Sequence, residues 1–362
     1  MGRLLMFFLC WLALLGPAVA QTECEQSLNF AAAEFEAGRF YSLPSILKPC
    51  LEKGFSTEQK VRAYLLLTQA HLILDDHAAA EDSYLQLLKA NPEFIASPTR
   101  DPIDVYYLSK KFTATPIFTP HFRLGLNTSL PRTIYSLNTS SVPALHSNSN
   151  VFKIGYQVGG GLDWNISESL SLCLGAGYSR KVLRNTPSDG NAGSDGRFTE
   201  KQDWFDFPLY IKYQIDSGKF RPFVYAGLAV NLLLSAKVAP EGTDFNAPFE
   251  GTQKVSQAPD QSLNSVRNFF NRSLVFGGGM KYKVGKNFFY VDVRYMAGMT
   301  NIVKNNGFSP LYLQFPQLQN DLFRLDNLSI SFGYVQPLYN PRKKGRIVAG
   351  LLETLHLKKK KK

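Results

Sequence analysis

Charged residues at alternate positions of strand-like segments are the first candidates for chemistry in this 362-residue sequence. They carry both signs: Arg123, Lys153, Asp163, Lys181, Asp206, Lys212, Lys281, Asp292 and Arg294. The five histidines have no spacing typical of a metal site. Cys173 has no neighbouring His or Cys, and we interpret it as a small buried residue rather than a nucleophile. We therefore expect no catalytic residues, no metal, no cofactor and no enzymatic activity.

The element that would position these charges is a strand. From Phe152 to Ile166, apolar residues fall on every second position, with Gly160 the only gap. A period of two is typical of a β-strand. Because about 9–11 tilted residues suffice to cross a membrane as a strand, this stretch predicts one strand of a membrane barrel.

Seven further segments alternate in the same way, and they centre on residues 122–127, 170–178, 205–214, 224–235, 273–284, 289–295 and 328–334. The connections alternate between short turns and long loops, which is typical of outer-membrane barrels. Aromatic residues at strand ends fit girdles at the two interfaces: Trp164, Trp204, Phe205, Phe288, Phe289 and Tyr339. The even strand count places both termini in the periplasm.

An eight-stranded barrel is only wide enough to be filled by its own side chains. We therefore interpret the inward charges as a paired network that fills the lumen and not as a conduction path. A buried carboxylate without a cation costs several kcal/mol, so Asp163, Asp206 and Asp292 should each have a Lys or Arg neighbour.

The N-terminal part has a different pattern. Residues 1–20 have the three-part form of a secretory signal peptide. Residues 21–112 follow a helical period, and the spacing of Tyr64, Leu67, Ala80 and Tyr84 resembles a tetratricopeptide repeat. Helical hairpins of no particular family are the alternative. The predicted fold class is therefore α+β multidomain: a small all-α domain followed by an eight-stranded antiparallel transmembrane β-barrel at 113–340.

Two cysteines of the helical segment, Cys24 and Cys50, are candidates for a disulfide. An exported compartment permits such a bond. Two buried free thiols are the alternative.

The formal charge of +11 does not indicate a nucleic-acid partner, because it is concentrated at the C-terminus. Residues 340–362 carry nine Lys or Arg and one Glu, which leaves only +3 for the rest of the chain. We assign residues 341–362 to a basic periplasmic tail that could lie on an anionic leaflet. A solvated tail, or one that contacts an acidic protein or cell-wall polymer, remains an alternative.

Three motifs carry a resemblance to a known family. They are Phe-Pro-Leu-Tyr-Ile-Lys-Tyr at 207–213, Arg-Pro-Phe-Val-Tyr-Ala-Gly at 221–227 and Ser-Ile-Ser-Phe-Gly-Tyr at 329–334. Together with the glycine-rich strand pairs, they make residues 115–340 similar to the PorT-like outer-membrane β-barrel family. The resemblance implies an outer-membrane barrel, but it implies no reaction.

Two functions follow from these features. The first is a non-enzymatic barrel in outer-membrane lipid that anchors a periplasmic helical module. Residues 21–110 of that module would bind an envelope protein, in envelope assembly or secretion. The second is a small-solute transporter, or an outer-membrane enzyme that works through its loops or lumen. The absence of a catalytic set and the narrow predicted lumen favour the first.

Overall fold

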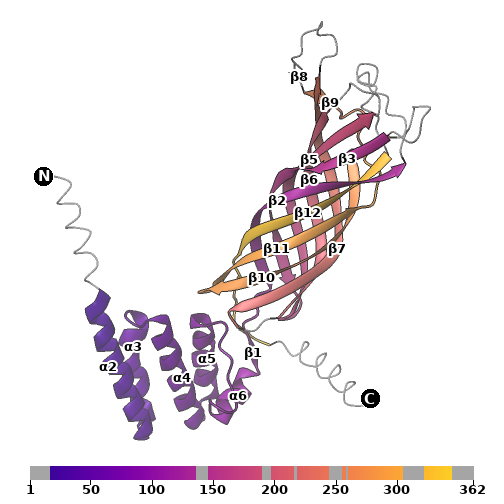
Figure 1. Cartoon of the computed structure of the whole chain (residues 1–362). Coiled ribbons are helices and arrows are strands. Elements are labelled where there is room, and N and C mark those ends of the chain that lie inside the picture. The colour runs from indigo at the N-terminus through magenta and orange to yellow at the C-terminus, as the bar shows by residue number, and fades with distance from the viewer. Residues whose placement is uncertain are drawn as a thin grey trace, which may run out of the picture. The chain divides into compact units, whose positions relative to one another are not determined.

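The chain forms two compact units in the computed structural model, which describes residues 17–135, 146–189, 197–215, 218–243, 255–257, 260–304 and 322–344 (Figure 1). One unit is the helical unit, residues 17–116 together with 339–344, and the other is Ile117–Leu338. Most of the predicted signal peptide (1–20) and most of the predicted tail (345–362) lie outside the described residues.

The helical unit contains α2 (Pro17–Glu36), the 3-10 helix η1 (Phe40–Ser42), α3 (Leu43–Glu52), α4 (Thr57–Ile73), α5 (His77–Ala90) and α6 (Ile103–Ser109). Helix α2 packs on α3, and α4 packs on α5. Helix α4 contributes to two apolar cores, one shared with α2 and α3 and the other shared with α5 and α6. Thr68 is buried where the helices meet, and its hydroxyl donates to the Tyr64 carbonyl (2.7 Å). None of the described helices is long and apolar enough to span a membrane.

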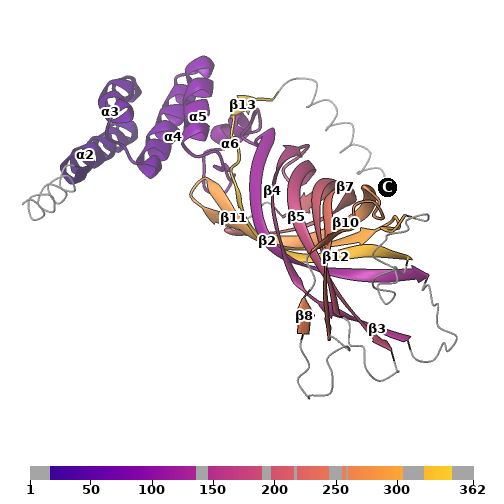
Figure 2. The ribbon, with the colours of Figure 1, turned by 90° about the horizontal axis from the view of Figure 1, so that it is seen from above.

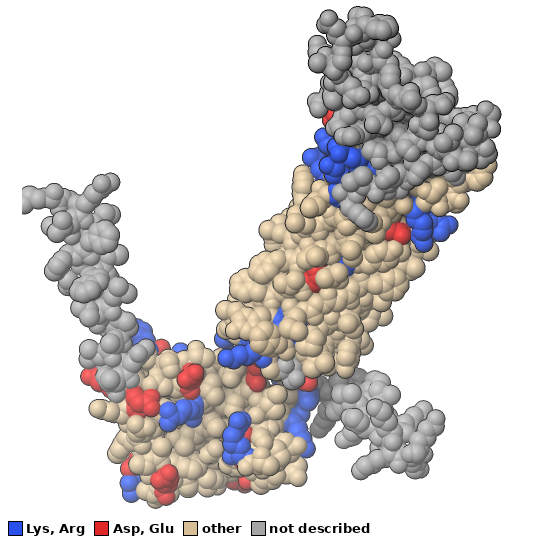
Figure 3. Space-filling view, in the orientation of Figure 1, with Lys and Arg blue, Asp and Glu red and all other residues tan. Residues whose placement is uncertain are grey.

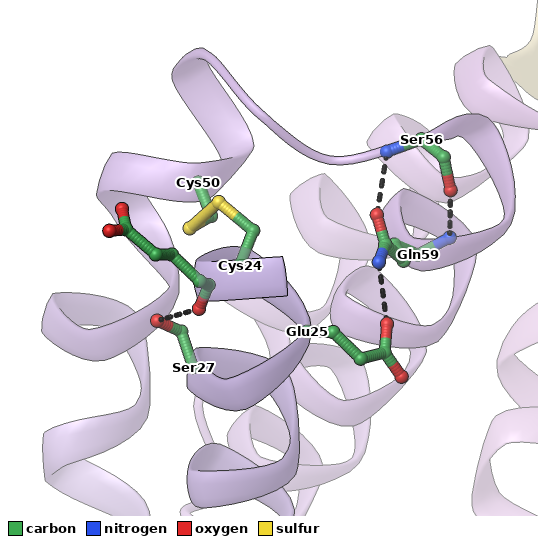
Figure 4. The surroundings of a disulfide bond; sticks show 7 residues. Cys24, Glu25, Ser27, Cys50, Ser56 and Gln59 are labelled. Carbon is green, nitrogen blue, oxygen red and sulfur yellow. Dashed lines mark hydrogen bonds between the residues drawn. A yellow bond between two sulfur atoms is a disulfide. The ribbon is translucent and has the colours of Figure 1, made fainter. Parts of the chain in front are cut away.

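The start of α4 is fixed by a capping box. Ser56 Oγ accepts from the Gln59 backbone N–H, and Gln59 Oε1 accepts from the Ser56 N–H (Figure 4). The Gln59 amide also donates to Glu25 on α2 (2.5 Å). The cap therefore ties the first helix to the third.

A disulfide joins α2 to α3 through Cys24 and Cys50 (Figure 4). Gly54 makes room for it: its φ of +147° suits glycine, and a Cβ there would lie 2.6 Å from Cys24 Sγ. The bridge crosses the apolar core that α2, α3 and α4 share.

The chain returns to the helical unit after the barrel. We call this segment, Tyr339–Lys344, the C-terminal clasp. Its strand β13 (Arg342–Lys343) pairs with β1 (Phe112–Thr113). The Lys343 ammonium donates to Glu81 on α5 (2.6 Å), and the Tyr339 hydroxyl donates to Glu93 (2.8 Å). The sequence-based division assigned residues 341–344 to a separate tail, whereas in the structure they pack on the helical unit.

The second unit is a closed antiparallel barrel. Its wall consists of β2 (Phe118–Tyr135), β4 (Ile154–Asn165), β5 (Leu170–Asp189), β6 (Arg197–Gln214), β7 (Phe220–Thr243), β10 (Phe270–Val284), β11 (Asn287–Gly298) and β12 (Leu322–Val335). Neighbours in sequence pair, β2 pairs with β12, and pairing of β10 with β7 completes the ring. The eight predicted strands are confirmed.

Short strands extend the barrel at its long-loop end. They are β3 (His146–Phe152), β8 (Val255–Gln257) and β9 (Gln261–Ser262), which pair with the far ends of β5 and β7. Figure 2 shows β3 and β8 at this end of the barrel. The strand predicted over residues 152–166 is therefore interrupted. Phe152 ends β3 and Ile154 begins β4, which leaves Lys153 at the break.

The alternation sorts the wall into two faces as predicted. Apolar side chains such as Ile154, Leu174 and Ile211 are exposed outside, and polar ones are buried inside. The assignment of three aromatic residues to the interfacial girdles is wrong. Trp204 and Phe288 are buried in the barrel interior, and Tyr339 belongs to the C-terminal clasp.

Trp204 faces inward because it follows the same alternation on β6 as Asp206, Tyr210 and Lys212. The neighbouring strand β7 carries a bulge opposite Trp204. The β6–β7 register shifts at this residue, which pairs with Leu233, while its neighbour Asp203 pairs with Ser235. The extra residue is Leu234, which is exposed. The bulge therefore puts both Leu233 and Ala236 on the inward face, with two residues between them.

Ile211→Arg tests the outer wall. Because Ile211 is 56% exposed on the apolar face, a cation there should lower the free energy of unfolding in lipid by about 2–4 kcal/mol. Urea titration with heat-modifiable gel migration measures the change. Ile211→Leu is the matched control and should unfold like the wild type. An arginine variant as stable as the control would contradict a lipid-facing wall.

A second prediction concerns the C-terminal clasp. The hydrogen bond from Lys343, together with the nearby Lys111 ammonium, lowers the pKa of Glu81 from 4.5. A lowered folded-state pKa stabilises the clasp above pH 4.5, and the contribution is lost as the pH falls through the folded value. Hydrogen-exchange protection of the Lys344 amide, which donates to the Lys111 carbonyl, should therefore fall between about pH 6 and about pH 3.

Glu81→Gln supplies the control for this measurement. It removes the titrating group, so protection of the Lys344 amide should be weaker at neutral pH and nearly constant across the same range. Equal pH dependence in the two proteins would show that Glu81 does not hold the clasp.

Candidate functional site in the barrel interior

The interior at the short-turn end is aromatic. Phe223, Phe288 and Tyr290 are buried there on β7 and β11. Two cations lie over these rings: Arg221 is 4.7 Å from the Phe288 centroid, and Lys281 Nζ is 5.6 Å from that of Phe223. Glycines on the facing strands make room, since a Cβ at Gly333 would lie 2.3 Å from the Tyr290 ring.

Asp163 of β4 is the first buried carboxylate above this layer, at 1% exposure. The Lys212 ammonium of β6 donates to its Oδ2, and His121 Nδ1 of β2 lies 3.3 Å from its Oδ1. Cys173 is the register partner of Asp163 on β5 and is fully buried. A carboxylate, an ammonium, an imidazole and a thiol thus meet inside the barrel.

Asp292 of β11 belongs to a second polar group at similar depth. The Tyr225 hydroxyl of β7 donates to Asp292 Oδ2 and accepts from Arg294 Nε (2.9 Å). Arg294 Nη2 itself lies 3.8 Å from Asp292. Tyr225 therefore bridges the cation and the carboxylate. A Cβ at Gly277 would lie 2.4 Å from the Tyr225 ring, so this glycine provides the space.

Asp206 of β6 is the carboxylate nearest the long-loop end. It accepts from Ser179 Oγ and Asn231 Nδ2, both at 2.6 Å, and Lys181 Nζ lies 3.6 Å away. The same ammonium is 5.1 Å from the Trp204 ring centroid. All three predicted carboxylates have a Lys or Arg within 4 Å.

The interior ends in a layer that the sequence did not reveal. Leu263, Val266 and Ile302, from the segments beside the long loops, are buried against Leu183 and Trp204 of the wall. We call this cluster the apolar cap.

One polar chain secures the cap. Arg267 donates twice to Glu200 (2.8 and 2.6 Å). Glu200 also accepts from the Gln202 amide (2.6 Å), whose Oε1 accepts from the Trp204 indole (2.9 Å). Because Glu200 accepts from both Arg267 and Gln202, the described segment that carries Arg267 is tied to the barrel wall by charge-assisted hydrogen bonds.

Comparison with known proteins identifies the barrel. A family model described as outer membrane protein beta-barrel domain matches residues 118–304, just over half of the chain. The chain belongs to this family. No protein with a curated description matches it significantly.

Solved outer-membrane barrels are similar to this chain at a low level. Neisserial surface protein A is 10% identical, covers 61% of this chain and 97% of its own, and has a TM-score of 0.30. OprG from Pseudomonas aeruginosa is 13% identical, with 61% and 97% coverage and a TM-score of 0.35. Ail of Yersinia pestis is 11% identical, with 60% and 97% coverage and a TM-score of 0.25. These values carry no inference about the role of this chain.

The interior of this outer-membrane barrel brings eight of the nine predicted charges together. Each of the eight is 6% exposed or less: Arg123, Asp163, Lys181, Asp206, Lys212, Lys281, Asp292 and Arg294. Lys153 is the exception. It is half-buried at the break between β3 and β4 and makes no ion pair with any described residue.

Arg123 shows how the predicted glycines serve this interior. It is buried on β2, and its guanidinium lies over Gly159 and Gly177, where Cβ atoms would be 3.4 and 3.7 Å from its nitrogens. Gly159 and Gly177 therefore provide room for a long cationic side chain.

The Cys173, His121 and Asp163 group contains residue types that catalyse acyl transfer elsewhere. Its geometry does not support that chemistry, because Cys173 is fully buried and His121 faces Asp163 beneath two further layers of side chains. Among the described side chains, no His, Cys, Asp and Glu group could hold a metal ion. The arrangement neutralises charge inside the barrel.

Lys212→Met tests whether the interior is held by charge pairing. Loss of the ammonium leaves Asp163 with His121 as its remaining partner, and the free energy of unfolding should fall by about 3 kcal/mol. The double variant Lys212→Met with Asp163→Asn removes both charges and should recover most of this loss. Urea titration of the folded barrel measures both, and failure of the second change to rescue the first would contradict the pairing.

Proposed function

We propose that the barrel is a non-conducting anchor and that the helical unit it carries binds a protein partner of the cell envelope. The single observation that supports this most is the filled interior. An aromatic layer, two levels of paired charges and the apolar cap follow one another along the described part of the barrel. A barrel closed in this way can hold a module at the membrane, but it offers little to a passing solute.

The helical unit is the part with features of a binding module. Stacked helix pairs with a shared core are the basis of repeat proteins that bind other proteins, and we propose a TPR-like role for residues 21–110. Two of its exposed residues, Tyr41 and Ile95, are 86% and 78% exposed. The PorT-like resemblance of the barrel is consistent with a role in envelope assembly or secretion.

We also propose an orientation, with the long loops outside the cell and both termini in the periplasm. Short turns on the periplasmic side and long loops outside are usual for such barrels. The Cys24–Cys50 disulfide fits an oxidising compartment. A basic tail that reaches an anionic leaflet is compatible with this orientation.

The alternative is a small-solute transporter or an enzyme that works through the loops or lumen. The observation that favours this alternative is the group formed by Cys173, His121 and Asp163 inside the barrel. It would require the apolar cap to open, and the Arg267–Glu200 pair opposes that opening.

Site-specific photo-crosslinking in intact cells tests the anchor function. A photoreactive residue at Tyr41 or Ile95 should give a protein adduct of defined mass, identified by mass spectrometry. The same residue at Ile154, 73% exposed on the outer wall, is the matched control and should give lipid adducts. Protein adducts from the wall but none from the helical unit would contradict a partner-binding module.

Conductance distinguishes the two functions. The purified protein in a planar bilayer should show no ion conductance. This holds for the wild type and for the variants with a photoreactive residue at Tyr41 or Ile95. Stable single-channel currents, lost when the cap is locked by a disulfide, would support the transporter instead.

A further inference from the structure

Cations gather on the outer face of the barrel wall, on the half nearer the long loops. Seven cations stand at outward positions in the half of each strand that is nearer the long loops. They are Arg132 of β2, Arg180 and Arg184 of β5, Lys201 of β6, Lys237 of β7, Arg272 of β10 and Arg324 of β12. We call this set the loop-side cation belt. It lies on six of the eight wall strands, and β4 and β11 carry none of its members.

The rest of the outer wall is different. From the belt to the short turns, outward positions carry apolar, aromatic or small side chains, such as Leu209 on β6, Leu228 on β7 and Ile330 on β12. Figure 3 shows few charged groups on this part of the wall, with Lys and Arg groups close to its loop end and others at its opposite end. The cations therefore mark one boundary of the apolar face.

Some of these cations face each other directly. Lys201 is the register partner of Lys237, and Arg132 is that of Arg324. Like charges opposite each other across two strands destabilise a sheet. A wall that needed only solubility at its rim would alternate the signs, so the pairing indicates an anionic partner outside the protein.

The carboxylates of this region are already engaged. Asp203 accepts from Arg180 (2.7 Å) and from the Tyr178 hydroxyl (2.6 Å). Asp326 accepts from the Tyr295 hydroxyl (2.8 Å) and lies 3.4 Å from Arg132.

Two cations of the belt are not neutralised by these carboxylates. Neither Lys201 nor Arg324 forms an ion pair with a described residue, and Arg324 Nε is buried without a hydrogen-bond partner among them. The belt thus has an excess of positive charge at the edge of the apolar wall.

We propose that the loop-side cation belt binds the phosphate groups of an anionic glycolipid in the surrounding leaflet. Long Lys and Arg stems can lie along the apolar wall while their charged ends reach the headgroups. Arginine offers a planar fork that matches phosphate oxygens, and lysine adds point charge. The acyl chains of the same lipid would cover the uncharged wall below. One lipid molecule thereby satisfies both surfaces.

This inference does not depend on the partner of the helical unit. It uses the proposed orientation only to name the leaflet, and its test is made in micelles, where orientation plays no part. A failure of the test therefore leaves the anchor function standing, and a failure of the crosslinking experiment leaves the belt standing.

The test is binding of bisphosphorylated lipid A to the full chain in a neutral detergent, followed by native mass spectrometry. Lys201→Gln with Lys237→Gln removes one opposed pair, and the affinity should fall about fivefold for each cation lost. Wild-type affinity should also fall as ionic strength rises. The fully dephosphorylated glycolipid should bind the wild type and the variant equally weakly.

The matched control is Lys219→Gln with Lys286→Gln, two exposed lysines at the short turns, which should leave binding unchanged. Heat-modifiable migration checks that each variant is folded. Lipid A binding that is equal in the wild type and the belt variant would overturn the proposal, as would equal binding of the phosphorylated and dephosphorylated lipids.

Discussion

Charge pairing inside a narrow barrel is the constraint on which the rest of this structure depends. Eight strands enclose a space that side chains must fill, and every strand alternates between this space and the outer face. Asp163, Asp206 and Asp292 can occupy it because Lys212, Lys181 and Arg294 reach them from other strands. Glycines such as Gly277 then yield the volume that the tyrosine and cation side chains need.

The same constraint determines how much the sequence can predict. The alternation identified all eight wall strands, and it placed eight of the nine charges inside, because a period of two is a local property of the chain. A bulge is not local, since it depends on the register with a partner strand. On β7 the extra residue Leu234 puts Leu233 and Ala236 on the same face, which the alternation of that strand alone did not predict. Trp204 is a different case: it was assigned to an interfacial girdle, although the alternation of β6 already places it inside with Asp206.

The apolar cap and the C-terminal clasp could not be predicted from the sequence, for a related reason. Leu263, Val266 and Arg267 lie in a long connection without periodicity, and their partner Glu200 is 67 positions away from Arg267. Lys343 stands in a basic run that reads as a solvated tail, and Glu81 gives no sign that it would accept from it. Contacts between distant, irregular segments leave no pattern in either segment alone.

Because of the clasp, residues from both ends of the chain belong to the helical unit. The helical unit is joined to the barrel by two covalent links, one that leads into β2 and one that leaves β12, and these two strands are paired neighbours. Beyond the barrel the same two chain segments pair again, as β1 with β13. The helical unit is therefore built from residues on both sides of the barrel in the sequence, and β1 and β13 close it.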